Sequence, residues 1–293
     1  MSPSGAASFR FVQIDVPGRI GIDDGRYLLR ASAEENGESV VVVQTLAAQA
    51  AGRARRRRRR PRPADPENAP TEVPVTRLTV IPAHEVSPEE AERELDSLGG
   101  DPDAAEQAVL AGLRQANRLM RAHRIATQDP YGHEIARSTV LGVRVGFGTG
   151  SELADGAWTH ALDVPAPERR RRRTDALRPQ ERLAELLAGR EDIDACETLL
   201  LRARADVDQG RMREAALQLA AGLDALLAEL PDHGGPGQED DLASLRERRD
   251  SIQRAATDAI RGEPSPAQVE ELAGALAICE RILRRRQALR DSR

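Results

Sequence analysis

Two segments rich in arginine and proline divide this chain of 293 residues and limit what it can fold into. The first covers residues 52–76 and the second covers residues 166–178. Such segments bury too little apolar surface to offset the conformational entropy lost on ordering, and their like charges repel one another. We therefore expect a disordered insertion at 52–76 within a domain of residues 9–165, and a linker at 166–178 before a second domain of residues 179–290.

The composition excludes several classes of protein and of chemistry. Aromatic residues make up 2% of the chain and the AVILMFWYC set makes up 40%, so any core is mainly aliphatic. The formal net charge is -5, and all 43 basic residues are arginine. Without lysine, a Schiff base, a phosphate-loop lysine and a lysine general base are excluded. An arginine-only chain also makes runs of arginine weaker evidence for a binding site.

The first domain has the pattern of an α+β fold. Apolar and polar residues alternate, or β-branched residues cluster, in six short segments: 9–16, 26–30, 38–46, 77–81, 139–147 and 158–164. Ser87 followed by Pro88 and Glu90 is a capping box that predicts a helix, which the pair Gly99-Gly100 ends. Asp101-Pro102 begins a second helix that continues to about Ala126. We expect five or six short strands and two helices.

The second domain is predicted to be all-α. Apolar residues recur at steps of three and four from Leu183 to Leu187, Ile193 to Val207, Met212 to Leu230, Leu242 to Ile252 and Val269 to Leu283. Seams of this period on successive helices joined by short turns are typical of an antiparallel bundle or an array of helical hairpins.

One stretch of this domain resembles a known repeat. Residues 209–219 and the pair Gly222-Leu223 are similar to one helix pair of the tetratricopeptide type, with a glycine at the turn and a small residue seven positions after Ala215. Leu199 and Arg202 depart from the large aromatic residue and the leucine that this family favours, and no second copy follows at a period of about 34 residues. The resemblance supports the geometry of two helices, and a domain that is possibly tetratricopeptide-like.

The arginine runs are candidate sites for a polyanion, because arginines that neutralise phosphates release counterions. The chain offers too few aromatic residues for a base-stacking platform, and a solvated linker is the alternative interpretation. The candidate residues are Arg55, Arg56, Arg57, Arg58, Arg59, Arg60, Arg169, Arg170, Arg171, Arg172 and Arg173.

Gly146-Phe-Gly-Thr-Gly150 is the string that most resembles a phosphate-binding motif. We expect no helix directly behind it, as a dinucleotide site would need, and therefore interpret it as a glycine-rich hairpin loop or bulge.

A second candidate is the loop Asp129-Pro-Tyr-Gly-His-Glu134, where Tyr131, His133 and Glu134 could line a pocket. The dipeptides His84-Glu85 and His133-Glu134 lack the second histidine of a zinc-binding helix. We expect no metal and no cofactor.

Cys196 and Cys279 fit no metal-binding or redox spacing and fall at apolar helix positions, which predicts two buried free thiols. The N-terminus shows no secretory signal, and the most apolar stretch, 39–51, is too short to span a bilayer. These features indicate a cytoplasmic protein.

The sequence favours a non-catalytic interaction or scaffold protein whose helical domain binds a partner protein or self-associates. Two alternatives stay open. One is a nucleic-acid or polyanion binder assisted by the arginine runs. The other is an enzyme with a site near Tyr131–Glu134 or Gly146–Gly150.

Overall fold

The structure is a computed structural model that describes residues 7–30, 37–46, 73–166, 173–230 and 237–290. The chain divides into two compact units, Met1–Arg169 and Arg170–Arg293. The first unit contains an antiparallel β-sheet with helices, and the second is all-α, as the sequence predicts at this level.

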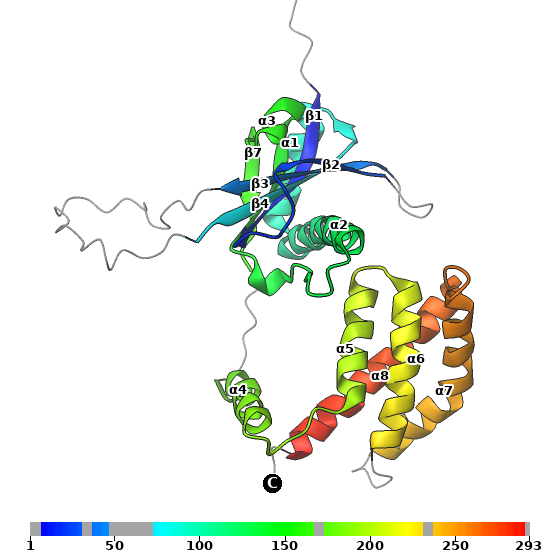
Figure 1. Ribbon diagram of the computed structural model, residues 1–293. Helices are drawn as coiled ribbons and strands as arrows, with labels where there is room; N and C mark the ends of the chain where they lie inside the picture. Colours follow the sequence, from blue (N-terminus) through cyan, green and yellow to red (C-terminus); the bar gives the residue numbers. More distant parts are fainter. Residues whose placement is uncertain (1–6, 31–36, 47–72, 167–172, 231–236, 291–293) are drawn as a thin grey trace, which may run out of the picture. The chain divides into compact units, whose positions relative to one another are not determined.

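Seven strands form the sheet within the described part of the first unit (Figure 1). They are β1 (Ser8–Pro17), β2 (Gly25–Leu29), β3 (Ser39–Leu46), β4 (Val75–Pro82), β5 (Glu85–Val86), β6 (Gly142–Thr149) and β7 (His160–Asp163). Their order is β2-β3-β4-β1-β6-β7, and β5 pairs with the beginning of β1. All pairs are antiparallel, so each strand alternates its side chains between a helix-covered face and an opposite face.

Two helices lie on the first of these faces, α1 (Pro88–Gly100) and α2 (Pro102–Thr127). The capping box predicted at Ser87 and Glu90 is confirmed, and Asp101 Oδ1 accepts from the backbone N–H groups of Asp103 and Ala104 to begin α2. The register places Ile14 beside both Leu78 and Val143 at the centre of this face. The same apolar cluster includes Val109, Leu113 and Ala116 of α2.

The structure of the first unit differs from the sequence prediction in four places. The two-residue strand β5 is too short for a periodic signal. A short 3-10 helix (Arg137–Thr139) precedes β6, so the strand begins at Gly142 rather than at 139. A third helix, α3 (Gly150–Ala154), lies where we expected a hairpin loop, because Thr149 and Glu152 form a capping box there. Val75 and Thr76 belong to β4, although we expected them in the insertion; residues 52–72 lie outside the described part of the chain.

The second unit contains α4 (Arg173–Leu187), α5 (Ala195–Asp208), α6 (Met212–Glu229), α7 (Gln238–Ala259) and α8 (Pro266–Arg290). Helices α5 to α8 pack around one aliphatic core (Figure 1). Its largest buried side chains are Leu200, Leu219, Leu223, Leu226, Leu245, Ile252, Leu272 and Leu276. Helix α4 begins at Arg173 and contains Pro179, so it extends into the segment 166–178 that we expected as a linker.

Candidate functional site

A cavity of about 330 Å³ opens on the helix-covered face of the sheet, between α1, α2 and the strands beneath them. Its walls are mostly apolar. The side chains that provide this apolar lining are Val12, Val80, Pro82, Leu98, Ala108, Val145 and Phe147. A volume of this size lies near the lower end of the range, about 300–1,000 Å³, that small-molecule pockets occupy.

The cavity exists because α2 presents small residues to the sheet at this point. Ala108, Ala111 and Gly112 lie within about one turn of each other along its wall. A Cβ atom at Gly112 would come within 2.6 Å of the Val12 side chain, so only glycine allows α2 to lie this close to β1. The large apolar residues of α2 predict a helix packed on the sheet, whereas this stripe of small residues is the signal that could have predicted the cavity.

Few polar groups line the cavity. Arg10 of β1 and Glu94 of α1 form an ion pair with an NH2 to Oε2 distance of 2.5 Å. Gln115 of α2 also lines the wall, and its side-chain amide has no hydrogen-bond partner among the described residues. The charge on the cavity lining is therefore balanced. Two neutral hydrogen-bonding groups remain available, the amide of Gln115 and the hydroxyl of Ser39 on β3, which also lines the cavity.

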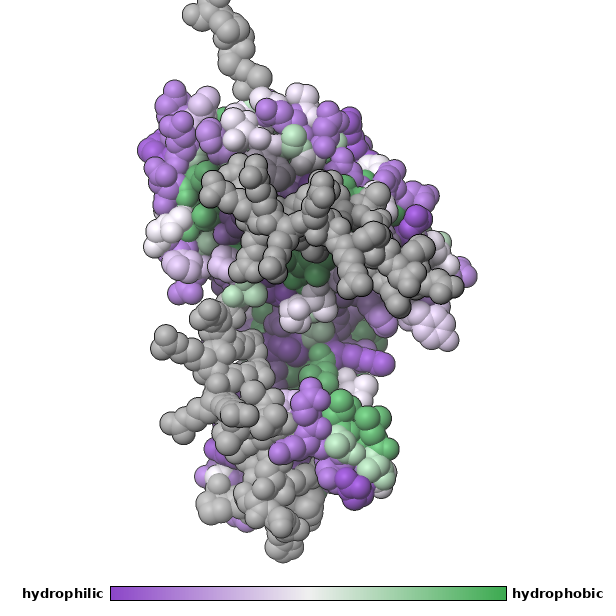
Figure 2. All heavy atoms as spheres, turned by 90° about the vertical axis from the view of Figure 1, so that its left-hand side faces the viewer, coloured by the Kyte–Doolittle hydropathy of each residue, from purple (hydrophilic) through white to green (hydrophobic). Residues whose placement is uncertain are grey.

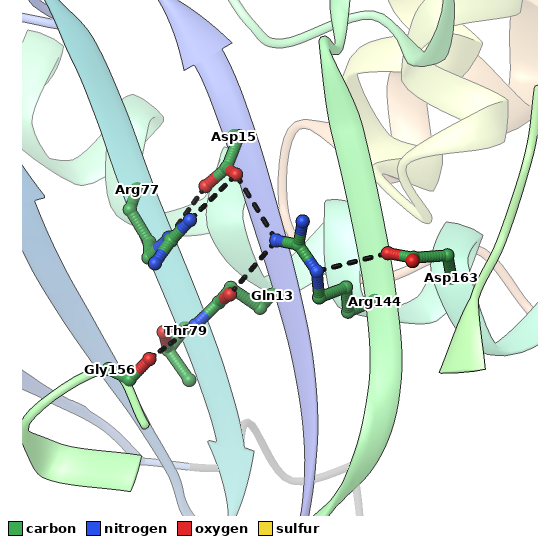
Figure 3. Close-up of polar contacts among 7 residues, drawn as sticks. All are labelled: Gln13, Asp15, Arg77, Thr79, Arg144, Gly156 and Asp163. Carbon is green, nitrogen blue, oxygen red and sulfur yellow. Dashed lines mark hydrogen bonds and ion pairs between the residues drawn. The ribbon is translucent and has the colours of Figure 1, made fainter. Parts of the chain in front are cut away.

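The opposite face of the sheet carries a polar ladder (Figure 3). Asp15 accepts two hydrogen bonds from Arg77, at 2.7 and 2.9 Å, and its Oδ2 lies 3.3 Å from NH1 of Arg144. Arg144 also pairs with Asp163 at 3.0 Å, and its guanidinium lies 5.3 Å from the centre of the Trp158 ring. Every charged group of this ladder thus has a partner of opposite charge.

The ladder continues inward through uncharged side chains. The amide nitrogen of Gln13 donates to Thr79 Oγ1 at 3.2 Å and to the carbonyl of Gly156 at 3.1 Å. Gln13 and Thr79 are almost fully buried. Buried polar groups are costly unless they are hydrogen-bonded. The bond from Gln13 to the Gly156 carbonyl therefore holds the turn after α3 against the sheet. We assign it a structural role.

The glycine-rich string has a packing function in this unit. Gly146 and Gly148 lie within β6, not in a loop. A Cβ atom at Gly146 would lie 2.1 Å from the carbonyl oxygen of His160, and one at Gly148 would lie 3.0 Å from Leu153. The glycines therefore allow β7 and α3 to approach β6, which explains the motif without a phosphate. Our expectation that no helix follows it was wrong, although α3 has only five residues.

Tyr131, His133 and Glu134 follow α2 and line a shallow depression of about 410 Å³, together with residues of the β1–β2 connection. The Tyr131 side chain is 81% exposed, so the depression is open to solvent. Nearby, a ring nitrogen of His123 lies 3.0 Å from the carbonyl oxygen of Gly21. The structure therefore brings the three predicted residues to one depression; whether it binds anything stays a prediction.

In the second unit, both cysteines are free and buried, as predicted. Burial raises the pKa of each thiol to about 12, and the carboxylate of Glu229 adds to this effect at Cys196. Glu229, at the end of α6, accepts hydrogen bonds at 3.1 Å from the backbone N–H groups of Ala195 and Cys196. The bond from Cys196 lowers the pKa of Glu229. A thiolate is the reactive form of cysteine, so these thiols are unsuited to nucleophilic chemistry.

Most of the arginines that were predicted to bind a polyanion lie outside the described part of the chain. Arg55 to Arg60 and Arg169 to Arg172 lie outside the described residues, and Arg173 is the first residue of α4. Within the described ranges, no group of three or more His, Cys, Asp or Glu side chains is placed to hold a metal ion. No helix in those ranges is long and apolar enough to cross a membrane.

Comparison of the chain with models of known protein families, with characterised proteins and with solved structures found no match.

Proposed function

We propose that the chain is a non-catalytic interaction protein that associates with a second copy of itself through α4. The observation that carries this proposal is the exposure of large aliphatic side chains on that helix. Leu187 is 79% exposed and Leu183, one turn earlier, is 47% exposed. Figure 2 shows hydrophobic surface gathered in the lower part of the view, on the side of the molecule where Figure 1 shows α4. Exposed apolar patches of this kind mark interaction surfaces.

The two sides of α4 differ in a way that suits association. Arg182 pairs with Glu197 of α5 at 2.7 Å and with Glu191 at 3.0 Å, so one side of the helix is held by ion pairs within the unit. Leu183 and Leu187 are the large aliphatic residues that the other side leaves uncovered.

The charges along α4 favour a second copy as the partner. In an antiparallel pair of α4 helices, Leu183 of one copy would pack against Leu187 of the second copy. Glu181, before the leucines, would then lie near Arg190 of the second copy, which follows α4 and pairs with Glu185 of its own chain, so Glu181 would be a second acidic partner for this arginine. Such self-complementarity is what a two-fold symmetric interface requires.

Two further features support this proposal. Gly222 is buried, and a Cβ atom there would lie 3.0 Å from Leu200, which supports a tetratricopeptide-like packing of α5 against α6. Two free, buried thiols support a cytoplasmic location, where disulfides are rare.

The test is the oligomeric state of the full chain, measured by sedimentation velocity over a range of concentrations. We expect a concentration-dependent dimer that the double variant Leu183→Glu, Leu187→Glu converts to a monomer. Leu28→Glu is the matched control, because Leu28 is 53% exposed on β2 of the first unit. A wild type that stays monomeric, or a dimer that survives the double substitution, would contradict the proposal.

A further inference from the structure

We infer that the cavity between α1, α2 and the sheet is a binding site for a small uncharged molecule with an apolar body and one hydrogen-bonding group. The inference concerns the first unit alone, so it is independent of self-association through α4. Three properties of the cavity support it: its volume, the charge of its lining and its neutral polar groups.

The volume and lining define the body of the ligand. The space of about 330 Å³ is open on one side and is lined by valine, phenylalanine and leucine side chains and by the small residues of α2. Val80, Val145 and Phe147 are each less than 9% exposed. An apolar molecule that fills this space removes its own surface from water, and this transfer drives binding.

The charge of the lining defines what the ligand lacks. Arg10 and Glu94 are the charged side chains that line the cavity, and they neutralise each other at 2.5 Å. A carboxylate on the ligand would face Glu94, and an ammonium group would face Arg10. Either charged group of the ligand would lose its hydration on binding and would find no unpaired protein charge of opposite sign. This loss of hydration costs free energy of binding.

Gln115, together with the Ser39 hydroxyl of the same lining, defines the polar group of the ligand. Its amide can donate and accept, and it makes no hydrogen bond with any other described residue. A hydroxyl or an amide on the ligand would satisfy it without introducing a charge. The site is therefore suited to a small alcohol or amide with an aliphatic or aromatic body.

The test uses the full chain and N-phenyl-1-naphthylamine, an uncharged dye whose fluorescence increases in apolar sites. We expect the dye to bind and to be displaced by 1-octanol and octanamide. Octanoate and octylammonium, which have the same chain but carry a charge, should displace it at least tenfold less well. Absence of dye binding, or equal displacement by all four competitors, would overturn the inference.

A pair of variants on α2 places the dye in this cavity. Ala108→Phe adds a ring to the wall of the cavity and should weaken dye binding at least tenfold. Gln107→Phe adds the same ring at the neighbouring exposed position, which does not line the cavity, and should bind like the wild type. Circular dichroism confirms that each variant is folded. If Ala108→Phe folds and binds the dye as well as Gln107→Phe, the cavity is not the site.

In a third variant, Gln115→Leu, the larger of the two neutral hydrogen-bonding side chains of the cavity is replaced by an apolar one of similar size. We expect this variant to keep the affinity for the dye and to lose the preference of the wild type for 1-octanol over octane. If the preference for the alcohol is unchanged, the role given to Gln115 is wrong.

Discussion

Glu229 shows how a single carboxylate can stabilise an element far from it in the sequence. Asp194 occupies the N-cap position of α5 but makes no side-chain capping bond. The N–H groups of Ala195 and Cys196 are instead satisfied by Glu229, whose negative charge also lies at the positive end of the α5 dipole. The same carboxylate raises the pKa of Cys196 and so helps to keep this thiol protonated.

Replacing this carboxylate should destabilise the second unit measurably. We expect Glu229→Ala to lower the free energy of unfolding by about 1 kcal/mol, the usual effect of losing a helix cap. Glu247→Ala, at an exposed position on α7, is the control and should change it by less than about 0.5 kcal/mol. Urea unfolding followed by circular dichroism measures both. Equal losses in the two variants would show that Glu229 does not act as a cap.

Among the elements, those with strong local signals could be predicted from the sequence. The capping box at Ser87 and the alternation of β1 each depend on neighbouring residues, and both are confirmed. Helix α3 was missed because five residues are too few to show a helical period. The cavity was missed for a different reason: it depends on which small residues of α2 meet which strands, and this is decided by tertiary packing.

The packing of α2 on the sheet can be tested at Gly112, because the position of this helix depends on the absence of a side chain there. We expect Gly112→Ala to destabilise the first unit by about 1–3 kcal/mol, the cost of overpacking, since the added Cβ meets Val12 at 2.6 Å. Gly99→Ala is the matched control. It lies in α1 with no atom near its Cβ, so the better helix propensity of alanine should stabilise by up to about 1 kcal/mol. Thermal unfolding that shifts downward for both variants would contradict this account of α2.

At the scale of the whole molecule, the two compact units have separate cores. The apolar clusters of the sheet unit include no residue of the helical unit, and the reverse also holds among the described residues. The sequence predicted an α+β part followed by a helical part because the period of its apolar residues changes from two to about 3.5 along the chain. It could not predict that α4 would leave Leu183 and Leu187 exposed, since burial of a helix face depends on what packs against it.

Separate cores predict separate responses to acid. In the helical unit, the pKa values of Glu185, Glu229 and Asp241 are lowered, mainly by hydrogen bonds from Arg190, from the backbone of Cys196 and from Arg281 respectively. In the sheet unit, the pKa of Glu152 is lowered, chiefly by the backbone of Thr149. A lowered pKa in the folded state contributes stability that is complete above the ordinary pKa, about 4, and is lost as the pH falls below it. Among the described residues, more such groups lie in the helical unit, so we expect it to lose more stability on acidification.

Two signals can follow the units separately during urea unfolding. Trp158, the single tryptophan of the chain, packs near Phe11 in the sheet unit and reports on that unit by fluorescence. Far-ultraviolet circular dichroism is dominated by the second unit, because its helices α4 to α8 contain about twice as many residues as α1 to α3 of the sheet unit. Between about pH 7 and about pH 3, the midpoint seen by circular dichroism should fall further than the midpoint seen by fluorescence. Glu229→Gln should reduce this difference, because it removes one of the titrating carboxyls. Midpoints that coincide at both pH values would mean that the two units unfold as one, and the account of separate cores would then be wrong.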